Sequence, residues 1–249
     1  MTRSILYTLI CIGCAQWMQG QQSTTRLTAH QQHAWFVGSG LLDIHPKWSI
    51  FYDVQARRES WGADLQQNLY RIGLFRKLSN NQLLGGGYAF VHTGVYGELP
   101  VKYPFDEHRG WLQFQTKQLF AKGQLTHRYR AEFRWIDPKK NLRQEIRARY
   151  MVRYQHTWSE SENTQWYTAV YDEVFVNMGT DVAYNIFDQN RFGVVMGRKF
   201  NRTLSLELGY LNQCIMQRSL TADGRNKMED NDTVLMSLIW NWSPKKKTP

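Results

Sequence analysis

Polar and apolar residues alternate with a period of two along much of this chain, most clearly over residues 124–135. In that stretch the even-numbered residues are polar or charged, and the odd-numbered ones are mostly apolar or aromatic. Because successive side chains of a β-strand point to opposite faces, the stretch predicts a strand with one charged and one apolar face. Residues 143–156 repeat the pattern, with every Arg and Glu on one face.

Similar runs, ten to fourteen residues long, recur through the sequence. They cover residues 35–44, 48–59, 65–77, 82–93, 109–120, 124–135, 143–156, 165–177, 191–200, 204–213 and 233–242. Strands of soluble proteins are typically about five or six residues long, whereas a tilted strand that crosses a bilayer needs about 9–11. The runs therefore favour strands that span a membrane.

We expect an all-β chain that forms a single antiparallel transmembrane β-barrel of about 10–12 strands. Short connections at 79–81, 121–123 and 201–203 alternate with long ones at 94–107, 178–188 and 221–232, as short periplasmic turns and longer outer loops would. Bacterial single-chain barrels have an even number of strands, so we expect a twelfth strand near 24–32. Ten strands remain possible if a terminal segment lies outside the barrel. The rival architecture is a soluble barrel that binds a lipid, with its aromatic faces turned inward.

The first twenty residues resemble an export signal. Arg3 is basic, residues 5–15 are apolar and uncharged, and this run is too short for a membrane helix of about 20 residues. We therefore expect a signal peptide at 1–20 and an outer-membrane barrel domain at 21–249, with lipidation at Cys14 as an alternative. The expected location is the outer membrane of a Gram-negative bacterium. The expected partners are membrane lipid, lipopolysaccharide and the barrel-assembly machinery.

The net charge of +10 is concentrated on the predicted strands. Residues 123–157 hold nine Lys or Arg and three Asp or Glu. Because the arginines stand on one face of exported strands with acids among them, this charge does not predict a nucleic-acid partner. Aromatic residues make up 14% of the chain, and many tryptophans fall near strand ends, as membrane-interface girdles require.

The charged faces together predict an arginine and carboxylate network in the lumen. Its members are Arg128, Arg130, Glu132, Arg134, Glu145, Arg147, Arg149, Arg153, Glu173, Arg191 and Glu207. Arginine pairs with carboxylates through two hydrogen bonds, so the network could fill and rigidify the barrel. It could instead form a constriction that attracts small anionic solutes. The turn-favouring residues Asp188, Gln189 and Asn190 are expected to pin the loop that precedes them.

The sequence offers little support for catalysis or cofactor binding. It contains no Gly-x-Ser-x-Gly motif, and Glu132 and Glu145 stand among arginines that would keep them ionised. His30 and His33 have no third metal ligand nearby. The glycines at 85–87 lie inside a predicted strand, where they favour barrel curvature or close packing. We expect no catalytic residue, metal or cofactor, and a membrane-embedded hydrolase is the weakest alternative.

Several motifs resemble an uncharacterised bacterial family, domain of unknown function 2490. They are Phe-Asp-Gln-Asn-Arg at 187–191, Glu-Leu-Gly-Tyr-Leu-Asn-Gln at 207–213 and His-Arg-Tyr-Arg-Ala-Glu-Phe-Arg at 127–134. Glu173 with Asn177 and Trp48 with Arg57 also fit. The resemblance implies an outer-membrane β-barrel and no particular activity. One position departs from it, because His108 precedes Arg109 where an acid is expected.

Two functions follow as hypotheses. The first is a channel for small solutes with a preference for anions. The second is a structural or interaction barrel whose outer loops bind partners. The sequence leaves the oligomeric state open.

Overall fold

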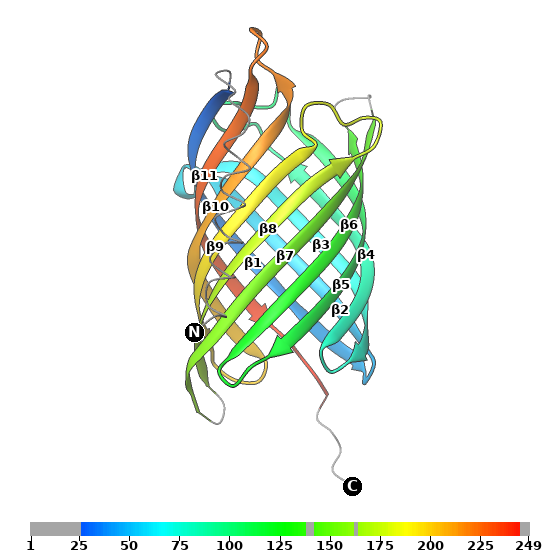
Figure 1. The fold of residues 1–249 in the computed structure, drawn as a ribbon, viewed down its shortest axis with the longest axis vertical. Coiled ribbons are helices and arrows are strands. Elements are labelled where there is room, and N and C mark those ends of the chain that lie inside the picture. Colours follow the sequence, from blue (N-terminus) through cyan, green and yellow to red (C-terminus); the bar gives the residue numbers. More distant parts are fainter. Residues whose placement is uncertain (1–25, 138–141, 162–163, 245–249) are drawn as a thin grey trace, which may run out of the picture.

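The computed structural model describes residues 26–137, 142–161 and 164–244, which form one closed β-barrel (Figure 1). The described residues contain eleven strands. They are β1 Arg26–His45, β2 Trp48–Glu59, β3 Asp64–Ser79, β4 Gln82–Thr93, β5 Phe105–Leu119, β6 Gly123–Asp137, β7 Arg143–Glu160, β8 Gln165–Met178, β9 Phe187–Lys199, β10 Leu204–Leu220 and β11 Asn226–Trp240. A short 3-10 helix, η1 Ser60–Gly62, follows β2. In this part of the chain, no helix has the length and apolar character that a membrane crossing demands. The expected signal peptide lies outside the described residues.

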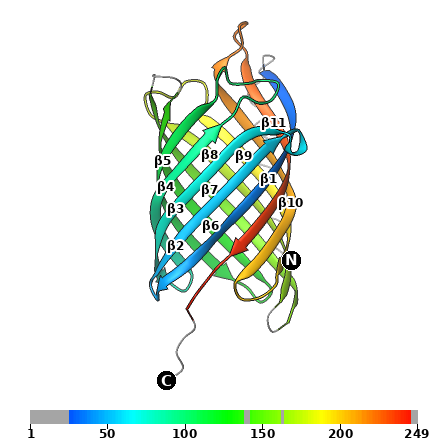
Figure 2. The ribbon, with the colours of Figure 1, turned by 180° about the vertical axis from the view of Figure 1, so that it is seen from behind.

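Each strand pairs antiparallel with its neighbours in sequence, and β1 closes the barrel by pairing in parallel with β11 (Figure 2). The all-β barrel is confirmed, but the expectation of antiparallel pairing throughout is wrong. With an odd number of alternating strands, the first and last must run in the same direction. The parallel register extends from Arg26 opposite Asn226 to Ser39 opposite Ile239.

The expected twelfth strand is also wrong. Its described part, residues 26–32, is continuous with the run at 35–44 in the single strand β1, which is 20 residues long. The residues between the two runs, His33 and Ala34, include no Gly, Pro, Asn or Asp that would favour a turn. The chain therefore stays extended where two strands were expected.

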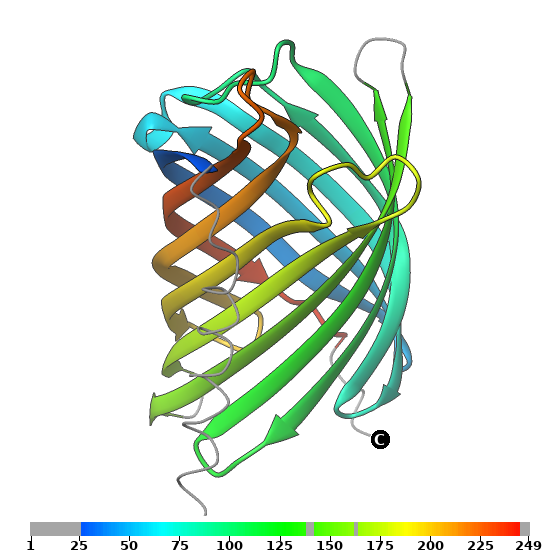
Figure 3. The same cartoon turned by 45° about the horizontal axis from the view of Figure 1, so that its top comes forward.

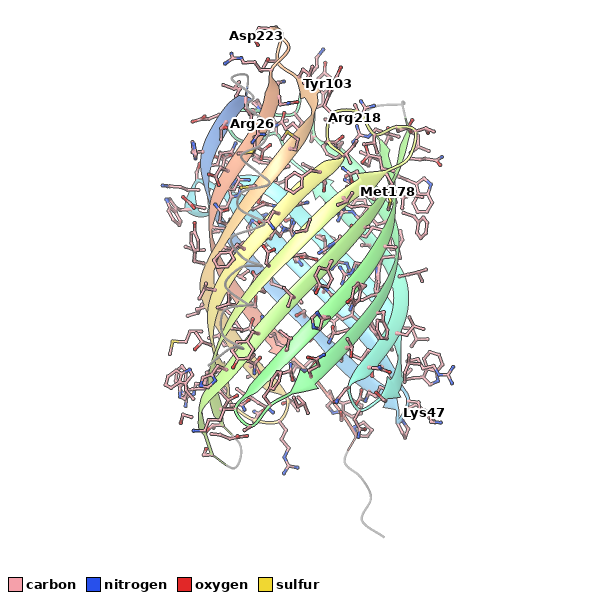
Figure 4. All side chains as sticks on the ribbon, viewed as in Figure 1. Arg26, Lys47, Tyr103, Met178, Arg218 and Asp223 are labelled. Carbon is pink, nitrogen blue, oxygen red and sulfur yellow. The ribbon has the colours of Figure 1, made fainter. Side chains whose placement is uncertain are left out.

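The connections at the two ends of the barrel differ in length. The longer ones, at 94–104, 179–186 and 221–225, gather at one end, which we call the loop mouth (Figure 3). The short turns at 46–47, 80–81, 120–122 and 200–203 form the other end, the turn mouth. Figure 4 shows Tyr103, Arg218 and Asp223 at the loop mouth and Lys47 at the turn mouth.

The two faces of each strand meet different surroundings. Tyr129, Phe133 and Tyr150 are 39–48% exposed on the outer wall, whereas Arg130 and Glu132 are at most 4% exposed and lie inside the barrel. The charged face therefore lines the lumen, and the aromatic face covers the outside. The soluble lipid-binding alternative requires the reverse orientation and is wrong in this respect.

Glycines allow a bulky aromatic cluster to pack inside the wall near the turn mouth. Gly73 and Gly87 lie opposite each other in the β3–β4 pair, and the ring of Trp111 rests against Gly73. Phe75 and Phe51 contact the same tryptophan ring, with ring centres 5.7 and 5.8 Å from it. Close packing is thus one role of this glycine-rich segment.

Replacing Gly87 by Ala should lower the free energy of unfolding by about 1–3 kcal/mol, the usual cost of overpacking. The new Cβ would overlap the carbonyl oxygen of Ile72 and the Cα of Gly73, both backbone atoms that cannot rotate away. Urea unfolding in detergent, followed by tryptophan fluorescence, measures the change. Gly38→Ala is the matched control, because nothing lies within 4 Å of the Cβ it would add. Equal unfolding midpoints for the two variants would contradict this account.

Candidate functional site inside the barrel

The lumen holds a cavity of about 400 Å³ that reaches from the loop mouth toward the middle of the barrel. Tyr96, Leu99 and Val101 of the loop at 94–104 line it from above, and side chains of all eleven strands form its walls, β4 contributing only Thr93. A second cavity of about 480 Å³ lies toward the turn mouth. Arg153 and Glu207 belong to the walls of both cavities, so this pair marks their junction.

Arginines dominate the first of these two cavities, the one that opens toward the loop mouth, which we call the upper cavity. Ten of them line it, and they are Arg57, Arg71, Arg109, Arg128, Arg130, Arg134, Arg147, Arg149, Arg153 and Arg191. Five acids line it as well, and they are Asp53, Glu173, Asp188, Glu207 and Glu229. Three further buried acids, Glu107, Glu132 and Glu145, pair with these arginines. Arg143 also pairs with Glu145, so eleven arginines stand against these eight acids, an excess of three positive charges.

Glu132 is the centre of the largest ion-pair cluster. One carboxylate oxygen lies 2.6 Å from Arg149 Nη1, and the other accepts from Arg147 Nε at 2.9 Å. Arg130 and Arg71 lie further off, at 3.8 and 4.0 Å. The Arg71 contact runs from β3 to β6, so the cluster links strands that are not neighbours in the barrel wall.

The same cluster extends through its arginines to further acids. Arg147 donates to Asp188 at 2.8 Å, and Arg149 donates to Glu173 at 2.8 Å. Glu173 also accepts from Arg128 at 2.8 Å. Because each arginine bridges carboxylates from different strands, these side chains fill this part of the lumen as a bonded unit.

A second cluster surrounds Glu107 nearer the loop mouth. Arg109 and Arg134 both donate to this carboxylate, at 2.6 and 2.5 Å, and Arg134 also pairs with Glu145 at 3.0 Å. Glu107 lies two residues before Arg109 and therefore on the same face of β5. Glu107 therefore provides the carboxylate next to Arg109 that the family resemblance leads us to expect at position 108. The third cluster is smaller, with Glu207 accepting from Arg153 at 2.6 Å and Tyr167 at 2.8 Å.

Two of the ten arginines, Arg57 and Arg191, have no acid within ion-pair distance among the described residues. Both pack against Trp35, with their guanidinium carbons 3.9 and 5.0 Å from its ring centre. The indole N–H of Trp35 donates to Gln66 at 2.8 Å, which fixes the ring. The two arginines that lack an ion-pair partner therefore meet at one tryptophan.

The loop at 94–104 is tied down over this cavity by three hydrogen bonds. Gly97 N donates to Glu59 at 2.7 Å, the Tyr96 hydroxyl donates to Glu229 at 3.4 Å, and Gln217 donates to the carbonyl of Leu99 at 2.8 Å. Gly97 adopts a φ of +75°, which glycine tolerates without strain. Burial, with Glu229 beside it, raises the pKa of Tyr96 well above its usual range, so its hydroxyl stays a hydrogen-bond donor.

The structure places all eleven residues of the predicted lumen set inside the barrel. Nine of them line the upper cavity, and Glu132 and Glu145 lie behind the arginines they bind. Among the described residues, ten of the eleven form ion pairs, and the exception is Arg191. The pairs divide into three clusters rather than the one connected network that the sequence predicts. Whether the set serves stability or permeation stays a prediction.

The predicted turn at Asp188, Gln189 and Asn190 lies within strand β9, so its description as a turn is wrong. The β8–β9 register shifts just there, and such a bulge re-aims side chains. Asp188 consequently accepts from Asn177 at 2.9 Å, and the same amide of Asn177 donates to the carbonyl of Asn185 at the end of the preceding loop. Asn190 instead donates to Asp172 at 2.8 Å. The proposed pinning role stays a prediction.

Sequence reasoning missed several members of the site, chiefly Trp35, Arg57, Arg71 and Arg109. The period-two pattern over 48–59, 65–77 and 109–120 could have placed the three arginines in the lumen, because each shares a face with inward-facing polar residues. The meeting of Arg57 and Arg191 at Trp35 has no sequence signal, since it joins β1, β2 and β9.

The described residues contain no cluster of three or more His, Cys, Asp or Glu side chains that could hold a metal ion. His33 is fully buried, whereas His30 is largely exposed and faces Asp230 at 3.5 Å. The two histidines therefore meet different surroundings.

A family model described as "Protein of unknown function (DUF2490)" matches residues 32–222. Comparison with curated proteins gives no match, and comparison with solved structures gives none either. The matched segment contains most of the barrel and every residue of the three ion-pair clusters.

Proposed function

Because the chain belongs to the DUF2490 family of proteins of unknown function, we propose its role from the barrel itself: it spans the outer membrane of a Gram-negative bacterium and admits small anions to a basic lumen. The outer wall supports the first part. Large apolar side chains such as Leu112, Tyr129 and Val194 are 38–58% exposed there. Apolar surface that extends around a whole protein is rare in water but suits the lipid face of a barrel.

Strand length supports the same proposal. The strands contain 12 to 20 residues, more than the roughly 9–11 needed to cross a bilayer. Closure of the barrel pairs the backbone of every strand on both sides, as a lipid environment requires. An odd strand number departs from the bacterial rule, but odd-stranded membrane barrels exist. In this setting the partners are lipid and lipopolysaccharide, and the barrel-assembly machinery inserts the chain.

The excess of arginine in the lumen carries the second part of the proposal. Charges that face a confined cavity with low-dielectric walls are screened less than charges on a surface. Two guanidinium groups without an ion-pair partner, Arg57 and Arg191, therefore attract small anions into the upper cavity and repel cations. The ion-pair clusters that fill the rest of the lumen restrict access to small solutes.

Purified barrel in a planar bilayer should give conductance steps that favour anions. A potassium chloride gradient across the bilayer supplies the measurement, because the sign of the reversal potential reports which ion passes more easily. Arg57→Glu should shift this potential toward cations, since it replaces one of the two positive charges that lack an ion-pair partner with a negative one. Barrel heated to unfolding is the control for leakage. An absence of conductance steps, or a reversal potential that shows a preference for cations, would contradict the proposal.

The second candidate is a closed barrel whose loops bind a partner at the cell surface. The anchoring of the loop at 94–104 over the cavity favours it, because this loop is held as a lid by Glu59, Glu229 and Gln217. The bilayer experiment separates the two candidates, since a closed barrel gives no steady steps.

A further inference from the structure

Among the described residues, Arg57 and Arg191 differ from every other arginine of the upper cavity in having no acid within ion-pair distance, and the acceptors they do have are neutral. Arg57 donates Nε and Nη2 to Gln55 and Nη1 to Gln67, at distances of 2.5–3.0 Å. Arg191 donates Nε to Gln189 at 3.1 Å. Glutamine oxygens satisfy hydrogen bonds but supply no negative charge, so neither guanidinium has a directly bonded counter-charge, although Glu173 lies opposite Arg191 in the β8–β9 pair.

Arg191 is also held in a fixed orientation with free donors. Its guanidinium carbon lies 5.0 Å from the ring centre of Trp35 and 4.7 Å from that of Phe175, so the group packs against both rings. Its two terminal amino groups have no hydrogen-bond partner among the described residues. A planar guanidinium with free terminal donors matches the two oxygens of a carboxylate or phosphate.

A buried acceptor lies beside these donors. Gln213 is directly opposite Arg191 in the β9–β10 pair, and both line the cavity. Its amide nitrogen donates to Gln189 at 2.6 Å, which orients the side chain. Its carbonyl oxygen is buried and has no partner among the described residues. A buried carbonyl of this kind needs a hydrogen-bond donor, since leaving it unmet is costly.

We propose that Arg57, Arg191 and Gln213 form a binding site for one small oxyanion that also carries a hydroxyl group. The anionic oxygens accept from the arginines, and the hydroxyl donates to Gln213 Oε1. A short hydroxycarboxylate or monohydrogen phosphate has this chemistry. An amino acid does not suit the site, because its ammonium group would lie beside two guanidinium groups. The inference deepens the proposed function and rests on it only in requiring that solutes reach the cavity.

Isothermal titration calorimetry of the full-length protein in detergent, at low salt, tests the site. Glycolate should bind saturably at one site per chain, and acetate, which lacks the hydroxyl, should bind about tenfold more weakly, a factor that corresponds to about 1.4 kcal/mol. The neutral analogue glycolamide should not bind. Inorganic phosphate is titrated separately and competed against glycolate, which decides which of the two sources of this chemistry the site prefers. Binding of glycolamide as tight as that of glycolate would overturn the proposal.

Two variants assign the binding to these residues. Arg191→Gln should weaken glycolate at least tenfold, whereas Arg198→Gln should leave it unchanged. Arg198 is on the same strand and also packs against aromatic rings, those of Trp166 and Phe200, but it does not line the cavity. Unchanged affinity in Arg191→Gln would overturn the assignment.

Gln213→Glu keeps the proposal testable if Arg191→Gln fails to fold. This near-isosteric change places a carboxylate opposite Arg191, so it should abolish glycolate binding, and its cost in stability is limited to the hydrogen bond that Gln213 Nε2 donates to Gln189. Retained binding in Gln213→Glu would overturn the proposal. Failure here is distinct from failure of the proposed function: saturable binding without conductance removes the channel, and conductance without saturable binding removes the site.

Discussion

Replacing Glu132 by Ala should lower the free energy of unfolding by about 3–5 kcal/mol, the cost of breaking a buried ion pair. Glu132 is 1% exposed and accepts hydrogen bonds from Arg147 and Arg149. Its removal leaves several guanidinium groups close together with less negative charge among them. Because Arg147 and Arg149 keep Asp188 and Glu173 as partners, the loss should resemble a broken pair rather than collapse of the lumen.

Urea unfolding in detergent measures this loss, and Asp223→Ala provides the control. Asp223 also pairs with an arginine, Arg225, at 2.8 Å, but its side chain is 59% exposed in the connection between β10 and β11. A solvated pair of this kind contributes little to stability, because water screens it. If Glu132→Ala unfolded at the same urea concentration as Asp223→Ala, the lumen charges would have to be hydrated and weakly coupled.

A lysine in place of Tyr129 should destabilise the barrel in lipid vesicles by about 2–4 kcal/mol, as charged side chains do at the middle of a membrane barrel. Tyr129 lies near the middle of β6, faces outward and packs against Tyr150 with ring centres 5.0 Å apart. In lipid the lysine would lose its hydration. In water the same change would cost only the aromatic contact, on the order of 1 kcal/mol.

Tyr184→Lys is the matched control for this experiment. Tyr184 is 61% exposed in the loop at 179–186, outside the strands. The proposed location requires a large difference between the two variants in vesicles. Equal stabilities, or recovery of the parent protein as a monomer without detergent, would show that the outer wall faces water.

Much of the fold can be predicted from side-chain alternation, because the period of a strand determines which residues share a face. Arg130 and Tyr129 are neighbours in sequence, yet one is buried in the lumen and the other is exposed on the wall. Alternation identifies strands and faces but contains no information on how the last strand meets the first. The parallel closure depends on the total strand number, which the continuous β1 changed from twelve to eleven.

The candidate site, too, can be predicted only in part from the sequence. Arg191 and Glu173 could be assigned to the lumen from their own strands, since each assignment needs only local sequence. Which acid each arginine binds depends on register and on distances across the barrel, as the Arg153 contact from β7 to Glu207 on β10 shows. The isolation of Arg57 and Arg191 could not be predicted, because it results from where the eight acids lie in three dimensions.

Parallel closure also gives the molecule two distinguishable ends. β1 begins with Arg26 at the loop mouth, and β11 finishes with Trp240 beside the 200–203 turn at the other mouth. In a barrel with an even number of strands, the first strand would begin and the last would finish at the same mouth. In the membrane orientation we propose, an epitope placed before β1 and another placed after β11 would be accessible from opposite compartments, so antibody labelling of intact and opened cells would test that orientation directly.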